Sequence, residues 1–114
     1  MPFDCTIERD GDTIVVAPEG DVDVDNAAAL RQVLHQVVDR QDCTRLDVDM
    51  SAVTFLDSPG LGMLIAAHRA AAGRGITLRL RDPGPMVRMV LEVTNLHELL
   101  TGEQQDPDAA TRAP

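Results

Sequence analysis

The chain has 114 residues, of which 44% are hydrophobic, and this length and composition fit one globular domain with a real core. Its formal net charge is -9 and all ten basic residues are Arg, so binding to nucleic acid or to an anionic membrane surface is disfavoured. The only aromatic residues are two Phe, which excludes an aromatic platform for stacking the bases of single-stranded nucleic acid.

The cysteines and the N-terminal residues favour a reducing compartment. Cys5 and Cys43 are too few for a disulfide framework or a zinc site, and the first residues show no signal-peptide pattern. The longest apolar run, 60–67, is too short to span a bilayer. We therefore expect a cytoplasmic protein without a membrane segment, a metal or a cofactor.

The N-terminal segment predicts a β-hairpin. Apolar and polar residues alternate from Phe3 to Glu8, and residues 13–17 are rich in β-branched side chains up to Pro18. Asp10-Gly11-Asp12 lies between the two runs and is a turn signal.

A helix is expected next. Asp23 or Asp25 can cap it, because a carboxylate accepts hydrogen bonds from the free amides of a first helical turn. The apolar residues that follow are spaced as on one face of a helix: Ala27, Leu30, Val33, Leu34, Val37 and Val38. Arg40, near the end, suits the negative end of the helix dipole.

The centre of the chain predicts a strand and a second helix. Leu46, Val48 and Met50 alternate with polar residues, and after a short break at Ser51-Ala52 the apolar run continues to Asp57, counted here with the same strand. A helix follows from Pro59 to about Ala72 and ends at the glycines of 73–75. Its expected buried residues are Leu61, Leu64, Ile65 and His68.

The last third predicts a strand over 76–81, a loop over 82–85 and a short helix that contains Met86, Val87, Val90 and Leu91. Residues 96–100 fit either a final strand or a helical turn. The domain is therefore expected over residues 1–101, and the polar, Pro-containing tail 102–114 is expected to be disordered.

Helices that alternate with strands predict an α/β fold. The expected order is β-β-α-β-α-β-α with a possible final β, which gives a mixed sheet of four to five strands with about three helices, mostly parallel after the hairpin. Binding and reactive groups in such sheets gather beyond the carboxyl ends of the strands. Asp57 and Ser58 occupy such a position, and five hypotheses compete for them.

Three of these hypotheses give Asp57, Ser58 or the glycines after them a catalytic or phosphate-binding role. For each of them, the sequence lacks residues that the role requires. A serine hydrolase needs G-x-S-x-G, but Leu56 replaces the first glycine and no histidine has an obvious route to Ser58. An aspartyl-phosphate receiver needs further acids for magnesium and a cation, and the chain has no Lys. A phosphate cradle at Gly60-Leu61-Gly62 lacks the rest of either nucleotide-binding motif.

The remaining two hypotheses are compatible with each other. Ser58 can be the N-cap of the second helix, with Pro59 at the favoured first helical position, which stabilises by about 1 kcal/mol. Ser58 can also be a phosphoserine site, because a phosphate there meets the positive end of the helix and adds about two negative charges beside Asp57.

The segment from Leu46 to Gly62 resembles the signature of STAS domains, specifically the small single-domain anti-sigma factor antagonists. The family pattern is a strand, D-x-S-x-V-x-F-x-D-S-S-G-L-G, and a helix. The matching residues are Asp49, Ser51, Val53, Phe55, Asp57, Ser58, Gly60, Leu61 and Gly62. Gly20-Asp21-Val22-Asp23 is similar to the family's acidic turn, and residues 83–96 resemble its third helix. The likeness covers about residues 3–100.

The resemblance implies a partner-switching function. The unmodified protein would bind an anti-sigma factor that is also a serine kinase, and so free a sigma factor. Phosphorylation of Ser58 by that kinase would end the binding, and a serine phosphatase would reset it. The implied partner-binding residues are Asp21, Asp23, Asp57, Ser58, Pro59, Gly60 and Leu61.

The chain departs from the family pattern in two places. Pro59 replaces the second serine of D-S-S-G, so the neighbour of Ser58 is rigid and has no N–H. The segment that corresponds to the family's C-terminal helix is short and polar. The alternative function within this fold is a STAS interaction module of a lipid-transport or stress-signalling complex, without phosphorylation; an enzyme is the alternative of another class.

Overall fold

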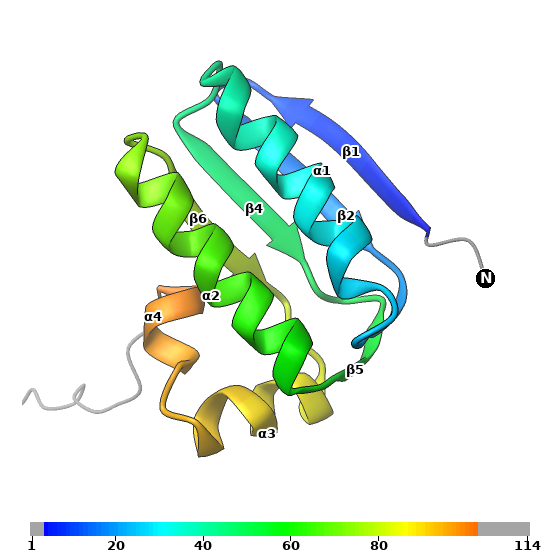
Figure 1. Cartoon of the computed structure of the whole chain (residues 1–114). Helices are drawn as coiled ribbons and strands as arrows, with labels where there is room; N and C mark the ends of the chain where they lie inside the picture. The colour runs from blue at the N-terminus through cyan, green and yellow to red at the C-terminus, as the bar shows by residue number, and fades with distance from the viewer. Residues whose placement is uncertain (1–3, 103–114) are drawn as a thin grey trace, which may run out of the picture.

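The computed structural model describes residues 4–102. Strands and helices follow one another in the order that Figure 1 shows. Their bounds are β1 Cys5–Asp10, β2 Thr13–Pro18, β3 Gly20–Val22, α1 Ala27–Arg40, β4 Arg45–Asp49, β5 Val53–Leu56, α2 Ser58–Gly73, β6 Thr77–Arg81, α3 Pro85–Val93 and α4 His97–Thr101.

The main sheet has four strands in the order β1-β2-β4-β6, and β3 and β5 form a second, two-stranded sheet. β1 and β2 are antiparallel, as the hairpin prediction requires, while β2–β4 and β4–β6 are parallel. The predicted α/β fold with a mixed sheet is confirmed.

The expected continuation of the central strand to Asp57 is wrong. The chain turns at Ser51–Ala52, where the amide of Val53 donates to the carbonyl of Met50 at 3.0 Å. β5 then pairs with β3 in parallel, not with the main sheet. This turn carries the end of β5, and the residues after it, beside the segment that precedes α1.

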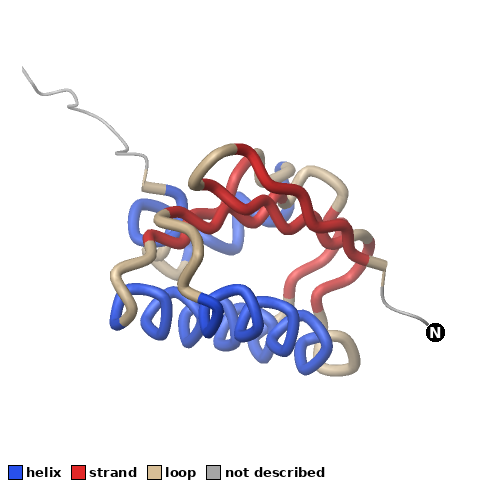
Figure 2. Tube along the Cα trace, turned by 90° about the horizontal axis from the view of Figure 1, so that it is seen from above, coloured by secondary structure: helices blue, strands red, loops and turns tan. Residues whose placement is uncertain are grey.

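Helices α1 and α2 cover one face of the main sheet, as Figures 1 and 2 show. Neighbouring positions in the register place apolar side chains on this face, and they are buried: Ile14, Val16, Leu46, Val48, Leu78 and Leu80. Leu30 and Leu34 of α1 and Leu64 of α2 pack into the same core. The opposite face of the sheet carries exposed polar residues such as Thr6, Arg45 and Arg81.

The first helix begins later than its expected caps. Its N-cap is Asn26, whose side chain does not cap it. The carboxylate of Asp23 instead accepts from the amides of Asp25 and Asn26, at 3.0 and 3.1 Å, and so fixes the turn before the helix. Capping by Asp25 is therefore wrong, because its backbone is part of that turn.

Residues 96–100, which fit either a strand or a helical turn by sequence, are helical in the structure. The amide of Leu100 donates to the carbonyl of Leu96 at 3.0 Å, and the Leu100 side chain is buried. α4 packs against β6.

The predicted disordered tail lies outside the described residues from 103 onward. Among the helices of residues 4–102, none is long and apolar enough to cross a membrane.

Candidate functional site

The start of α2 differs from its predicted capping. Asp57 has extended backbone and is the N-cap, and its Oδ1 accepts from the amide of Gly60 at 2.8 Å. Ser58 is the first helical residue and Pro59 the second. The prediction that Ser58 caps the helix is wrong, because the carboxylate one residue earlier already reaches the amide that a cap would satisfy.

Asp57 also holds a second segment. Its Oδ2 accepts from the amide of Val24 at 3.0 Å, and its own amide donates to the carbonyl of Val22 at 3.3 Å. One carboxylate therefore joins the start of α2 to the turn that precedes α1. The sequence contained no signal for the contact with Val24, because backbone amides leave no mark on residue identity.

Gly60 allows the close approach of α2 to β3. A Cβ at this position would lie 2.4 Å from the carbonyl oxygen of Val22, so no larger residue fits without movement of the backbone. Leu61, next along the helix, is buried in the core. Gly60 and Leu61 thus support the surface around Ser58 from beneath.

The other residues that the family resemblance implies for partner binding lie at this surface. Ser58, Pro59 and Asp21 are exposed, while Asp23 and Asp57 are half-buried. Oδ1 of Asp21 accepts from Oγ1 of Thr54 on β5, at 3.0 Å, which fixes that carboxylate beside the small sheet. The structure thus brings the acidic turn and Ser58 to one end of the molecule, as Figure 1 shows for the segments that carry them.

Among the described residues, no base is hydrogen-bonded to Ser58 so as to activate it. Within residues 4–102 its hydroxyl makes no hydrogen bond. His97 is buried on α4, where its Nε2 lies 3.1 Å from Nη1 of Arg88. A guanidinium only donates, so Nε2 of His97 accepts in this contact.

His68 lies on the second half of α2 and lines a hollow with Arg79 of β6. Burial lowers the pKa of His68, and the cations Arg79 and Arg69 lower it further. Among the described residues, no group of three or more His, Cys, Asp or Glu side chains is placed to hold a metal ion.

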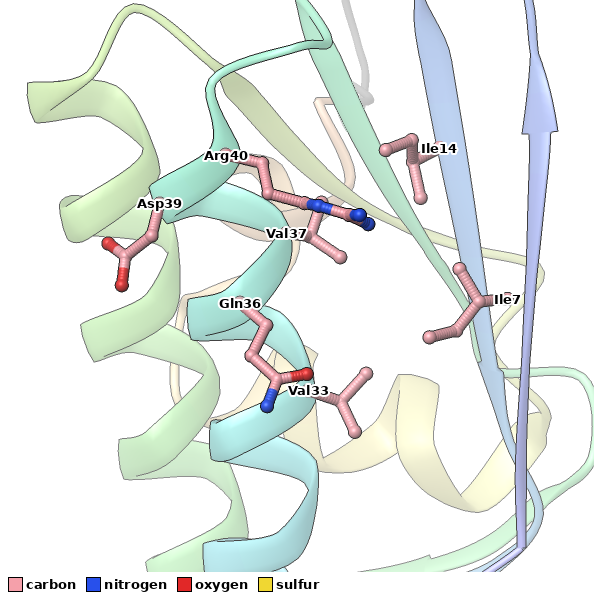
Figure 3. Close-up of a pocket in the computed structure, with 7 residues that line it drawn as sticks. All are labelled: Ile7, Ile14, Val33, Gln36, Val37, Asp39 and Arg40. Atoms are coloured by element: carbon pink, nitrogen blue, oxygen red, sulfur yellow. The ribbon is translucent and has the colours of Figure 1, made fainter.

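A groove of about 450 Å³ lies elsewhere, between the edge strand β1 and the helix α1 (Figure 3). Its lining is Ile7, Ile14, Val33, Gln36, Val37, Asp39 and Arg40. None of the residues that the sequence assigned to partner binding belongs to it. The groove and the Ser58 surface are therefore separate features.

Comparison with known proteins identifies the family of this chain. The sequence model of a family described as "Mlab, STAS domain" matches residues 5–101. The chain is 30% identical to the anti-sigma-F factor antagonist RsfB of Mycobacterium tuberculosis, with 85% of this chain and 86% of that protein covered.

Solved structures show the same fold. An anti-sigma factor antagonist from Mycobacterium paratuberculosis is 28% identical and has a TM-score of 0.75, covering 98% of this chain and 96% of that one. SpoIIAA in its unphosphorylated form is 20% identical, with a TM-score of 0.74 and coverage of 96% and 95%. The phosphorylated form of SpoIIAA from Bacillus has a TM-score of 0.69 at 19% identity, with coverage of 96% and 98%.

Proposed function

Because the chain belongs to the STAS-domain family of anti-sigma factor antagonists, we propose that it binds an anti-sigma factor and thereby releases a sigma factor for transcription. The partner is a serine kinase, and the chain acts in the cytoplasm as a binding protein, not as an enzyme. The observation that carries this proposal is the exposed Ser58 at the first position of α2, beside an acidic turn that Asp57 holds in place.

The chemistry at Ser58 belongs to the partner in this proposal. Oγ of Ser58 attacks the γ-phosphorus of ATP that the kinase holds, so that an Oγ–P bond forms and the bond from phosphorus to the bridging oxygen of ADP breaks. The hydroxyl proton passes to a base of the kinase, and the products are phosphoserine and ADP. A serine phosphatase later transfers the phosphoryl group to water.

A phosphate at Ser58 finds little compensation on its own chain. A helix start normally offers free amides to an anion. Here Pro59 has no N–H, and the amide of Gly60 already donates to Asp57. The added charge, about -1.5 to -2, therefore faces the partner beside the carboxylate of Asp57. Each 1.4 kcal/mol of repulsion and desolvation weakens binding about tenfold.

A second candidate function is a STAS interaction module without a phosphorylation cycle, in a lipid-transport or stress-signalling complex. The observation that favours it is Pro59, which places a rigid residue next to the serine that a kinase must accommodate. Both functions use the same surface, but only the first requires a phosphate on Ser58.

One experiment separates these functions. The purified chain is incubated with ATP and, in turn, with each kinase-like anti-sigma factor encoded in the genome it comes from, and mass spectrometry then locates any phosphate. We expect complex formation without ATP and phosphate on Ser58 with ATP. Complex formation with no phosphate on any residue supports the second function, and no complex with any anti-sigma factor overturns the first.

Matched variants give the controls. Ser58→Ala should bind the partner and receive no phosphate, whereas Ser51→Ala changes another exposed hydroxyl and should be phosphorylated like the wild type. Ser58→Asp should weaken binding at least tenfold, because it places a charge at the same point. Equal binding by wild type, Ser58→Ala and Ser58→Asp contradicts regulation at this residue.

A further inference from the structure

Five exposed apolar side chains lie on segments that adjoin one another near the start of α2. In residues 4–102 the exposed large apolar side chains are Ile7, Val24, Phe55, Met86, Met89, Val93 and Leu99. Val24 follows β3, Phe55 is on β5, and Met86, Met89 and Val93 are on α3. These three segments meet at the end of the molecule where α2 begins. We call these five residues the apolar collar.

The contacts that bring these segments together are specific. The amide of Val24 donates to Asp57, so Val24 is held next to the residue that precedes Ser58. Phe55 lies two residues before Asp57, opposite Asp21 in the small sheet. α3 packs against β5, and Figure 1 shows it at the same end of the molecule as the start of α2.

The rotation of α3 leaves its methionines facing outward. Val87 and Leu91 are buried and fix which side of α3 meets the core. Met86, Met89 and Val93 recur every three or four residues, so they share another side of the helix. Arg88 extends in a different direction, toward His97 of α4. Met89 is 56% exposed and Val24 is 67% exposed. Exposed apolar side chains that lie on adjoining segments, and not singly, are typical of an interaction site.

We propose that the apolar collar is the main docking surface for the anti-sigma factor, with Ser58 at its border. This inference rests on the function proposed above and names the surface and the chemistry of its partner. The partner presents apolar side chains to the collar and basic groups to the exposed carboxylates of Asp21 and Asp25. A second copy of this chain is disfavoured as the occupant, because both copies carry a net charge of -9 and would repel each other.

The apolar collar also explains why phosphorylation of Ser58 would end the binding of the partner. A doubly charged phosphate is costly to remove from water when the surface that covers it is apolar. Methionine side chains adapt their shape to a partner, so they supply contact without a preformed pocket. The unmodified surface can therefore be buried by the partner, and the modified one cannot.

The test measures the dissociation constant, by calorimetry, for the anti-sigma factor that forms a complex with the wild type. Met89→Glu and Val24→Glu should each weaken binding at least tenfold, and Met89→Leu should leave it within about twofold. The matched control is Ile7→Glu, which changes a side chain that is 55% exposed in the groove of Figure 3, and it should bind like the wild type.

The outcomes are distinct. Wild-type affinity in both Met89→Glu and Val24→Glu overturns the collar but leaves the proposed function intact, whereas the absence of any wild-type complex overturns both. Circular dichroism checks that each variant is folded. If Met89→Glu on α3 does not fold, Val24→Glu still tests the collar, because Val24 lies in a turn. A wild-type dimer that Met89→Glu dissociates, found by light scattering, means that a second copy covers the collar and overturns the proposal.

Discussion

Two carboxylates, Asp57 and Asp47, hold different regions of this molecule by different means. Asp57 is half-buried at the start of α2 and accepts from two backbone amides, those of Gly60 and Val24. Asp47 is 3% exposed on the opposite face of the main sheet and accepts from Nε of Arg45 at 2.7 Å and Nη1 of Arg81 at 3.1 Å.

The two carboxylates differ in how their partners can respond when the carboxylate is removed. The backbone partners of Asp57 cannot move away without changing the path of the chain near Ser58. The guanidinium groups that hold Asp47 belong to half-exposed side chains, which can turn toward water. Asp57 therefore shapes the candidate site, whereas Asp47 joins β4 to its surroundings without reaching that site.

The largest expected effect is at Gly60, beneath Ser58. Gly60→Ala places a methyl group 2.4 Å from the carbonyl oxygen of Val22, so α2 must move from β3, and we expect a loss of about 3 kcal/mol in the free energy of unfolding. The control is Gly62→Ala two residues later, where the added Cβ would meet no atom from outside its own stretch of helix within 4 Å, and where alanine should stabilise the helix by about 0.5–1 kcal/mol. Urea unfolding measures both. Equal stability of the two variants would mean that α2 is not closely packed on β3.

The next effect is at Asp57. Asp57→Ala removes an N-cap and the acceptor for Val24, and we expect a loss of about 2 kcal/mol in the free energy of unfolding. Amide hydrogen exchange should become faster at Val24 and Gly60 in particular. Asp21→Ala, which removes an exposed carboxylate of the same region, should leave both amides protected. Unchanged exchange in Asp57→Ala would show that the carboxylate does not hold the two segments together.

The sequence predicted most of the fold because the apolar periods are clear. The hairpin, the helix after the acidic turn and the alternation around Leu46 all follow the pattern of buried side chains. The departure of β5 from the main sheet was not predicted, because an apolar run of four residues does not say which strand it pairs with. The same holds for the short α4, where Leu96 and Leu100 fit two periods.

The residues of the candidate site were predicted from the sequence, but the hydrogen bonds between them were not. Asp57 and Ser58 were found from their place at the end of a strand and from the family pattern. The cap was assigned to Ser58, one residue late, because Asp and Ser are almost equally good caps and the sequence does not rank them. The burial of Asp47 was not predicted, because only the tertiary structure brings Arg81 over it.

A smaller effect is expected at Asp47. Asp47→Ala removes two charge-assisted hydrogen bonds, but the freed arginines become hydrated, so we expect a loss of about 1.5 kcal/mol in the free energy of unfolding. Hydrogen exchange at Val24 and Gly60 should stay as in the wild type. Faster exchange at these amides would contradict the separation of the two regions.

The smallest expected effect is a pH dependence from His68, on the second half of α2. Burial, Arg79 and Arg69 hold its pKa below the ordinary value of 6.5 in the folded chain. As pH falls below 6.5, the unfolded chain takes up a proton before the folded one does, so this contribution to stability is full above 6.5 and is lost as the pH falls toward the folded pKa. An NMR titration of the His68 ring measures the folded pKa directly. Arg79→Gln removes one of the two cations and should raise the pKa of His68 toward its ordinary value, and an unchanged titration in that variant would leave burial and Arg69 as the only causes.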